Sequence, residues 1–290
     1  MKLLLVGSQG QVGQELSSSL KKLGNVISWS RHDIDLCNIN DIIPKITALH
    51  PDAIINAAAY TAVDKAETEP ELAYRINRDA PEQMALAAQK CGTTLIHIST
   101  DYVFDGLKGL PYKETDETNP GSVYGASKLA GEEAIQRVDG KYVILRTAWV
   151  HGAQGKGNFV KTILRLAKER ALLTIVEDQV STPTWAQDIA NTITTVLPAL
   201  DKNTYGVYHC TNSGVASWYD LAIAAVEEAR HLGVPLKVKE IKPITTEEYP
   251  LPAKRPAYSA MSNVKLRNLI GTTLPYWRDS LRSMLTELYS

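Results

Sequence analysis

The sequence predicts an α/β protein with a Rossmann-type, doubly wound parallel sheet and a smaller C-terminal α/β lobe. In the first half, short apolar runs alternate with longer amphipathic runs, which is the pattern of βαβ units. The first apolar run ends in a glycine-rich turn, and the alternation changes after Val150. In a sheet of this kind, the ligand is expected at the carboxyl ends of the strands.

Five strands and four helices make up the first half of this prediction. Apolar runs predict strands at Lys2–Val6, Val26–Trp29, Ala53–Asn56, Thr94–Ser99 and Tyr142–Arg146. Amphipathic stretches predict helices at Gln11–Leu23, Ile39–Leu49, Pro70–Lys90 and Tyr124–Val138.

The second half is expected to serve both lobes. Residues 1–150 form the predicted first domain, and residues 183–212 are expected to return to it. Residues 151–182 and 213–290 form the predicted second lobe. The elements expected there and in the returning segment are helices at Asn158–Arg170, Thr184–Val196, Trp218–Leu232 and Tyr276–Leu288, and strands at Leu173–Glu177 and Tyr205–Cys210.

Composition argues against several classes of protein. The 31 basic and 32 acidic residues give a net charge of −1, so no basic surface for nucleic acid is expected. No apolar run approaches the roughly 20 residues that a membrane span requires. The cysteines Cys37, Cys91 and Cys210 are scattered and form no CxxC motif, which fits a reducing compartment. We therefore expect a cytoplasmic protein that acts on a small molecule.

The glycine-rich turn has the spacing of a dinucleotide-binding site. Gly7, Gly10 and Gly13 lie between a predicted strand and a predicted helix. Such glycines make the tight turn, let the backbone approach a pyrophosphate, and let the helix pack closely on the strand. The amides at the helix N-terminus then face the phosphates. Residues 1–150 are therefore expected to bind a nicotinamide dinucleotide.

The end of the second predicted strand indicates which dinucleotide is preferred. An acidic residue there usually accepts hydrogen bonds from the free 2′-hydroxyl of NADH, but this sequence has Ser30 and Arg31. An arginine can pair with the 2′-phosphate of NADPH, so NADPH is favoured, with NADH as the other possibility. The alternative is that Arg31 is an ordinary solvated surface residue. Asp35 and Leu36 follow and are expected to flank the adenine.

A candidate acid/base pair begins the helix predicted from Tyr124. Tyr124 and Lys128 are four residues apart, so both lie on one helix face. A nearby ammonium stabilises a phenolate and lowers the pKa of the tyrosine, which would let it exchange protons. Such pairs often occur by chance, but Thr100 ends another predicted strand and supplies a third polar group.

These motifs together resemble those of the extended short-chain dehydrogenase/reductase superfamily. Longer blocks resemble the dTDP-4-dehydrorhamnose reductase family over the whole chain, namely residues 56–67, 99–104, 146–150 and 252–256. That resemblance implies reduction of dTDP-6-deoxy-L-lyxo-4-hexulose (dTDP-4-dehydrorhamnose) by NADPH to dTDP-L-rhamnose, with no metal in the chemistry.

The resemblance also implies roles for individual residues. Tyr124 would be the proton donor, Lys128 its partner and a contact of the nicotinamide ribose, and Thr100 the group that orients the substrate carbonyl. Asp101 and Trp149 would contact the substrate, and Arg255 is proposed for its diphosphate because guanidinium suits phosphate. The residues expected along the cofactor are Gly10, Gln11, Val12, Asp35, Leu36, Ala59, Tyr60 and Thr61. An arginine in a proline-rich loop such as that of Arg255 is, however, just as often a solvated charge.

Three alternatives were weighed against this interpretation. Related 4,6-dehydratases carry an Asp-Glu pair after the strand-end threonine, whereas Thr100 is followed by Asp101 and Tyr102. Epimerases would prefer an acidic contact to the ribose, which Ser30 and Arg31 do not supply. Another reductase or epimerase of nucleotide-linked 4-keto-6-deoxysugars is the second alternative. A third is a non-catalytic NADP-binding regulatory subunit that resembles the β subunit of methionine adenosyltransferase.

Assembly is expected to depart from part of the family. Some members form a dimer bridged by Mg²⁺ on glutamates, and the matching positions here are Glu15, Gln187 and Glu287. One carboxylate is replaced by a neutral amide, which weakens a Mg²⁺ site. The expectation is a monomer or homodimer that does not depend on Mg²⁺.

Overall fold

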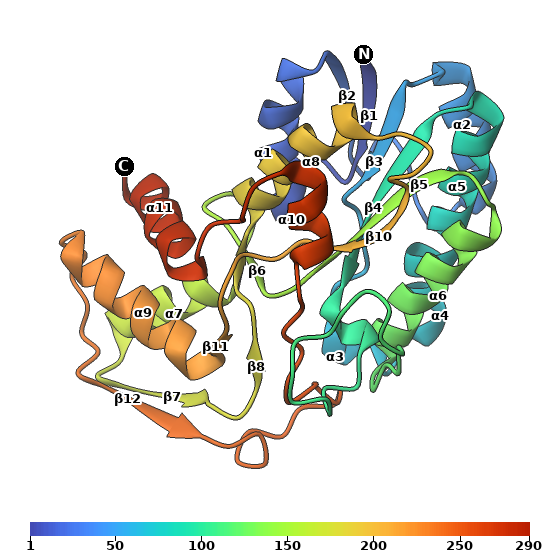
Figure 1. Cartoon of the computed structure of the whole chain (residues 1–290). Coiled ribbons are helices and arrows are strands. Elements are labelled where there is room, and N and C mark those ends of the chain that lie inside the picture. Colours follow the sequence, from blue (N-terminus) through green and yellow to red (C-terminus); the bar gives the residue numbers. More distant parts are fainter.

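A six-stranded parallel sheet forms the centre of the first domain (Figure 1). The computed structural model describes all residues from 1 to 290. The strand order is β10-β5-β4-β3-β1-β2. The strands are β1 (Lys2–Val6), β2 (Asn25–Trp29), β3 (Ala53–Asn56), β4 (Thr94–Thr100), β5 (Lys141–Thr147) and β10 (Gly206–His209). The direction of winding reverses between β1 and β3, so the ligand crevice is expected at the carboxyl ends of these two strands.

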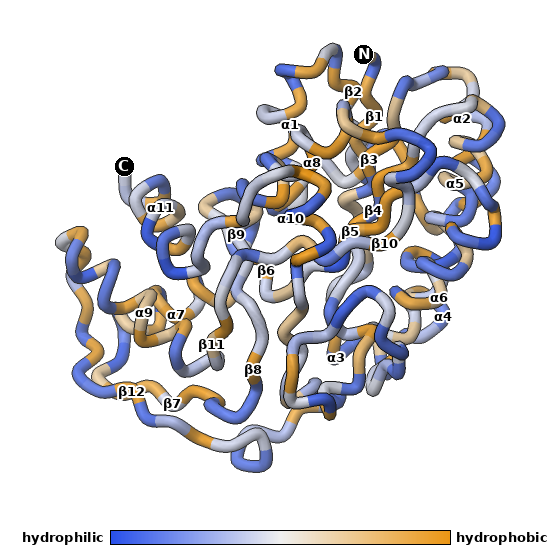
Figure 2. Tube along the Cα trace, viewed as in Figure 1, coloured by the Kyte–Doolittle hydropathy of each residue, from blue (hydrophilic) through white to orange (hydrophobic).

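Helices cover both faces of this sheet. Its helical elements are α1 (Gln11–Ser19), η1 (Leu20–Lys22), η2 (Ile39–Asp41), α2 (Ile42–Leu49), α3 (Val63–Ala66), α4 (Pro70–Tyr74), η3 (Arg75–Asp79), α5 (Ala80–Cys91), η4 (Asp101–Val103), α6 (Val123–Arg137), α8 (Ala186–Ala199) and α10 (Val264–Ile270). Leu3 and Leu5 face the core shared with α1, α8 and α10. Leu4 and Val6 face the core shared with α2, α5 and α6. Because both faces are buried, the strands are continuous apolar runs (Figure 2).

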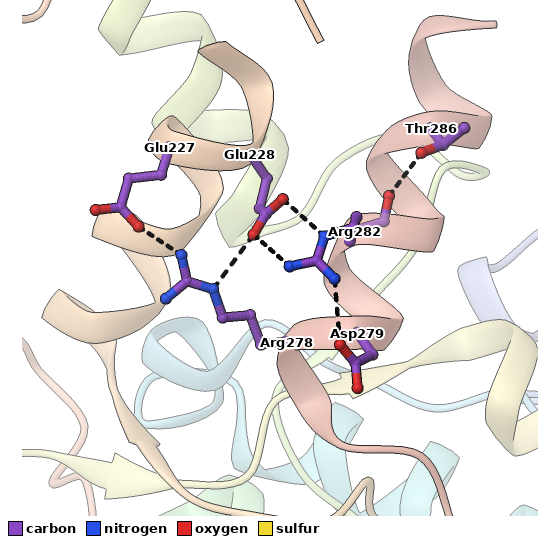
Figure 3. Close-up of polar contacts among 6 residues, drawn as sticks. All are labelled: Glu227, Glu228, Arg278, Asp279, Arg282 and Thr286. Atoms are coloured by element: carbon purple, nitrogen blue, oxygen red, sulfur yellow. Dashed lines mark hydrogen bonds and ion pairs between the residues drawn. The ribbon is translucent and has the colours of Figure 1, made fainter. Parts of the chain in front are cut away.

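The second lobe packs three helices around its own core. Its elements are β6 (Val150–His151), α7 (Phe159–Glu169), β7 (Leu172–Val176), β8 (Val180–Ser181), β9 (Thr184–Trp185), β11 (Ala216–Ser217), α9 (Trp218–His231), β12 (Glu240–Ile244) and α11 (Trp277–Tyr289). Trp277 and Leu281 of α11 pack with Leu221 of α9 and Val160 of α7. Between α9 and α11, the buried carboxylate of Glu228 accepts hydrogen bonds from two arginines of α11, Arg278 and Arg282 (Figure 3).

The predicted elements agree with the structure most closely in the first half. The helix expected over 70–90 is interrupted by a π-helical turn, η3, and the helix expected from Thr184 begins at Ala186 because Thr184–Trp185 pairs as β9 with β6. The strand expected at 205–210 is β10, which pairs with β5. Two of the longer elements were missed, β12 and α10, as were the short elements α3, β6, β8, β9 and β11. Leu266 of α10 packs in the core of the first domain, although residues 213–290 were assigned to the second lobe.

Helix α6 approaches the rest of the first domain unusually closely. A Cβ added at Gly131 would lie 2.0 Å from the carbonyl oxygen of Asn77, so only glycine fits there. One residue later, Glu132 is fully buried and forms an ion pair with Arg146 of β5 at 2.7 Å. The Ser99 hydroxyl of β4 donates to the same carboxylate at 2.5 Å. A buried, hydrogen-bonded ion pair therefore fixes α6 to two adjacent strands.

We predict that Arg146→Met destabilises the fold by about 3 kcal/mol, because it leaves the Glu132 carboxylate buried without a partner. Urea denaturation monitored by circular dichroism measures this. The matched control is Arg165→Met on α7, which should cost less than about 1 kcal/mol because both partners of its ion pair with Glu169 are more than half exposed. Equal losses in the two variants would contradict the structural role of the buried pair.

Candidate active site

The glycine-rich turn after β1 packs closely on the segment after β3, and only its second glycine, Gly10, faces open space. Gly7 has a φ of +83°, and a Cβ there would lie 2.6 Å from the backbone nitrogen of Ala58. A Cβ at Gly13 would lie 2.1 Å from the Gly7 carbonyl oxygen. Helix α1 begins at Gln11, directly after Gly10, so its first amides lie at the turn. The turn therefore has the geometry that a pyrophosphate site needs.

The turn after β2 holds the residues expected near the adenine ribose. The carboxylate of Asp33 accepts hydrogen bonds from the Ser30 amide at 2.7 Å and the Ser30 hydroxyl at 2.8 Å. Those bonds hold the pKa of Asp33 below its usual value. Arg31 is exposed and takes part in none of the ion pairs of the structure. Asp35 is also exposed, and Leu36 is half-buried. Sequence reasoning missed Asp33, which orders this turn through Ser30.

The segment after β3 is held by a residue that the sequence did not single out. Asn77 accepts from the amide of Tyr60 at 2.9 Å and donates to its carbonyl oxygen at 3.1 Å. The same side chain donates to the Ser127 hydroxyl of α6 at 3.0 Å. The predicted cofactor segment, Ala59 to Thr61, is thereby tied to the helix that carries the acid/base pair.

Two predicted residues at the end of β4 lie in a buried polar cluster. The Thr100 hydroxyl donates to Asp101 at 3.1 Å. The other oxygen of Asp101 accepts from Ser181 at 3.2 Å and Ser259 at 2.5 Å. Burial raises the pKa of Asp101 to about 6, although these hydroxyls lower it. Ser181 and Ser259 come from distant parts of the chain, which is why sequence spacing could not identify them.

Tyr124 lies in the first turn of α6, beside Thr100. The Ser122 hydroxyl caps the helix by accepting from the Gly125 amide at 3.2 Å. Burial raises the pKa of the Tyr124 phenol to about 12, while a hydrogen bond with the Thr100 side chain lowers it. The Tyr102 ring packs edge-on against the Tyr124 ring at 5.4 Å. The phenol therefore keeps its proton at neutral pH.

Lys128 corrects one expectation about this pair. Its ammonium was expected to lower the pKa of Tyr124, but Lys128 does not contribute to that shift. The Nζ atom instead donates to the Ile98 carbonyl oxygen at 2.6 Å and lies 3.2 Å from Nε2 of His97. The side chain is fully buried, and burial lowers its pKa to about 8. The ammonium that was expected to act on the phenol is therefore hydrogen-bonded to the Ile98 carbonyl oxygen.

The expected substrate residues occupy different environments. Trp149 has a left-handed backbone, with φ of +45°, and stacks on Trp218 of the second lobe at 3.5 Å between ring centroids. Such backbone strain in a residue other than glycine is typical of functional sites. Arg255 forms a two-pronged ion pair with Asp64, at 2.8 and 3.0 Å. It is therefore not a solvated surface charge, and its guanidinium already has an anionic partner in the absence of a diphosphate.

The comparisons with known proteins agree with this geometry. The family model described as the RmlD substrate binding domain matches residues 1–290. A curated dTDP-4-dehydrorhamnose reductase from Escherichia coli K12 is 44% identical, over 100% of this chain and 99% of the relative. The chain belongs to the dTDP-4-dehydrorhamnose reductase family.

Two solved structures of that family have the same fold. The dTDP-4-dehydrorhamnose reductase from Clostridium acetobutylicum is 40% identical, with a TM-score of 0.92 and full coverage of both chains. The enzyme from Bacillus anthracis, solved in complex with NADP, is 35% identical, with a TM-score of 0.91 over 99% of this chain and 100% of that chain. No helix of the present structure combines the length and the apolar character needed to cross a membrane.

The positions where some family members hold Mg²⁺ lie together here on the surface. Glu15, Gln187 and Glu287 line one open pocket of about 530 Å³, away from Tyr124. Burial and the neighbouring Glu287 raise the pKa of Glu15 to about 7. The amide of Gln187 donates to Ser19 at 3.0 Å and to Asn191 at 2.9 Å. Both hydrogens of the Gln187 amide are thus used in hydrogen bonds within the chain. The site has one negative charge fewer than three glutamates would give.

We predict that any dimer of this protein does not depend on Mg²⁺, because an amide replaces one carboxylate of the site. Sedimentation velocity should give the same sedimentation coefficient in about a thousandfold molar excess of Mg²⁺ over protein and in EDTA. The matched control is Gln187→Glu, which restores three carboxylates and should make the dimer sensitive to chelation. Dissociation of the wild-type dimer by EDTA would refute this prediction.

Proposed function

We propose that this protein is the NADPH-dependent reductase that converts dTDP-6-deoxy-L-lyxo-4-hexulose to dTDP-L-rhamnose. The observation that carries the proposal is the buried set of Tyr124, Thr100 and Lys128 around the carboxyl end of β4, in a chain of this family. The glycine-rich turn follows β1 at the same edge of the parallel sheet. We infer further that residues 1–150 bind NADP, that residues 151–182 and 213–290 bind the sugar nucleotide, and that the protein acts in the cytoplasm as a monomer or homodimer.

The residues fit a nicotinamide dinucleotide. The open side of Gly10, where an added Cβ would meet only the Gly7 carbonyl oxygen at 3.4 Å, suits the pyrophosphate. Gly10, Gln11, Val12 and Gly13 would follow the phosphates, and Ala59, Tyr60 and Thr61 the middle of the cofactor. Ser30 and the exposed Arg31 would meet the 2′-phosphate, with Asp35 and Leu36 at the adenine. When bound, the nicotinamide supplies a hydride.

The chain itself supplies the proton. As the C4 carbonyl oxygen gains negative charge, the Tyr124 phenol donates its proton to it. The Thr100 hydroxyl, turned from Asp101, donates a hydrogen bond to the same oxygen. A pKa of about 12 suits this direction of reaction, since the phenol is protonated before each turnover. For Lys128, with a pKa of about 8, to return a proton to the phenolate, its Nζ atom would have to turn from the Ile98 carbonyl oxygen towards Tyr124.

The substrate contacts follow from the same cluster. Asp101, fixed by Ser181 and Ser259, would accept from a sugar hydroxyl. Trp149, supported by Trp218, offers an apolar face to the sugar ring. For Arg255 to bind the diphosphate, it would have to share its guanidinium with Asp64 or release it.

We predict that Tyr124→Phe lowers kcat at least about 10²-fold but leaves the Kd of NADPH nearly unchanged, because only the proton donor is lost. NADPH oxidation with the keto sugar nucleotide measures turnover, and fluorescence titration measures binding. Tyr208→Phe is the matched control, since this buried tyrosine lies on β10 and donates to Thr204. Turnover close to that of the wild type in Tyr124→Phe would show that Tyr124 is not the proton donor.

We also predict that Arg31→Asp raises the KM for NADPH at least about 10-fold more than that for NADH, because it replaces a phosphate partner by a repelling charge. Steady-state kinetics with both cofactors measure the ratio. Lys90→Asp, an equal change of charge at an exposed position of α5, serves as the control. Equal effects on the two cofactors would place Arg31 outside the site.

A further inference from the structure

Three buried polar side chains connect the sheet to the acid/base pair. Asn56 ends β3, His97 lies opposite it on β4, and Lys128 reaches them from α6. Asn56 and His97 are fully buried, and Lys128 is 1% exposed. Nδ2 of Asn56 lies 3.0 Å from Nδ1 of His97, and Nε2 of His97 lies 3.2 Å from Nζ of Lys128.

The backbone decides where the proton of this histidine lies. The amide of Ala58 can only donate, and it donates to Oδ1 of Asn56 at 3.1 Å. The Asn56 amide group therefore turns its NH₂ towards His97, and Nδ1 of the histidine must accept. Burial and the charge of Lys128 hold the pKa of His97 well below its usual value, so the ring is neutral. Its one proton is then on Nε2, which faces Lys128.

With the proton on Nε2, His97 can form a hydrogen bond with the neutral form of Lys128 but not with the charged form. A neutral amine has a lone pair and can accept from the Nε2–H group of His97. An ammonium has only N–H donors, so it meets another donor at 3.2 Å. The ammonium can keep its bond to the Ile98 carbonyl at 2.6 Å, but its other N–H groups must turn away from His97. Tyr124 lies one turn earlier on the same face of α6.

We propose that His97 is a positioning residue for Lys128: its Nε2–H group, fixed by Asn56 and the Ala58 amide, stabilises the neutral amine and turns the protonated ammonium towards Tyr124 and the cofactor. This inference rests on the proposed function, in which Lys128 serves Tyr124. Other ionisable groups near Lys128 are Glu132 on its own helix, paired with Arg146 of β5, and, beyond Tyr124, Asp101 after β4.

The test is a direct titration of Lys128 in the full chain without cofactor, by NMR of ¹³Cε-labelled lysine with Lys128→Arg for assignment. His97→Leu should raise the pKa of Lys128 by about one unit, because the neutral amine loses its donor. His97→Gln, which can keep an N–H donor at that position, should leave the pKa within about 0.3 units. Asn56→Ala tests the same inference from the other side of His97. Without the Asn56 side chain, the histidine proton can move from Nε2 to Nδ1, so the pKa of Lys128 should rise as well.

The kinetic readout separates positioning from packing. We expect His97→Leu to lower kcat at least about 10-fold, because a misplaced ammonium no longer serves the phenol, and His97→Gln to recover it to within about threefold. The control is His209→Leu, which removes another fully buried histidine of the same sheet and should leave kcat and the Lys128 titration unchanged.

Two results would overturn the inference: an unchanged pKa of Lys128 in both His97→Leu and Asn56→Ala, or equal losses of kcat in His97→Leu and His209→Leu without rescue by glutamine. A wild-type protein that fails to reduce the keto sugar nucleotide would contradict the proposed function instead. The titration would still decide the effect of His97 on Lys128.

Discussion

The close docking of helix α6 on the sheet is the constraint on which the site depends. Gly131 lets the helix approach the carbonyl oxygen of Asn77. The buried ion pair of Glu132 and Arg146 fixes the position of the helix along the sheet and its rotation about its own axis. Tyr124 and Lys128 lie on this helix, so their distances from the ends of β3 and β4 follow from that docking. Buried ion pairs contribute little net stability, but they penalise every arrangement that separates them. The pair therefore specifies one position for the acid/base residues.

Burial then determines the charge states in the site. The same dry environment raises the pKa values of Tyr124 and Asp101, and lowers those of Lys128 and His97. Each shift favours the neutral form. At neutral pH, Tyr124 and His97 are neutral, whereas pKa values of about 6 and about 8 leave Asp101 ionised and Lys128 protonated. Hydrogen bonds with fixed direction hold both charged groups. Such a site suits a reaction in which negative charge develops on one oxygen, because the surrounding donors are already aligned and water does not screen them.

The sequence could predict what depends on local pattern. Buried parallel strands require continuous apolar runs, the turn at Gly7 requires glycine, and Tyr124 and Lys128 share a helix face by spacing alone. What it missed depends on contacts between distant segments: Asp64 meets Arg255 across 191 residues, and Ser259 meets Asp101 across 158. Strand β12, with the sequence EIKPI, was missed because its charges and proline are tolerated only at the edge of a two-stranded sheet.

The most direct test of this account is to follow the transferred hydrogen. The protein would be incubated with dTDP-6-deoxy-L-lyxo-4-hexulose and NADPH that carries deuterium at both hydrogen positions of nicotinamide C4, and the sugar product analysed by NMR. The account predicts dTDP-L-rhamnose with deuterium at C4 of the sugar. A product of other configuration at C4, a product without deuterium, or tight NADPH binding with no product would contradict it.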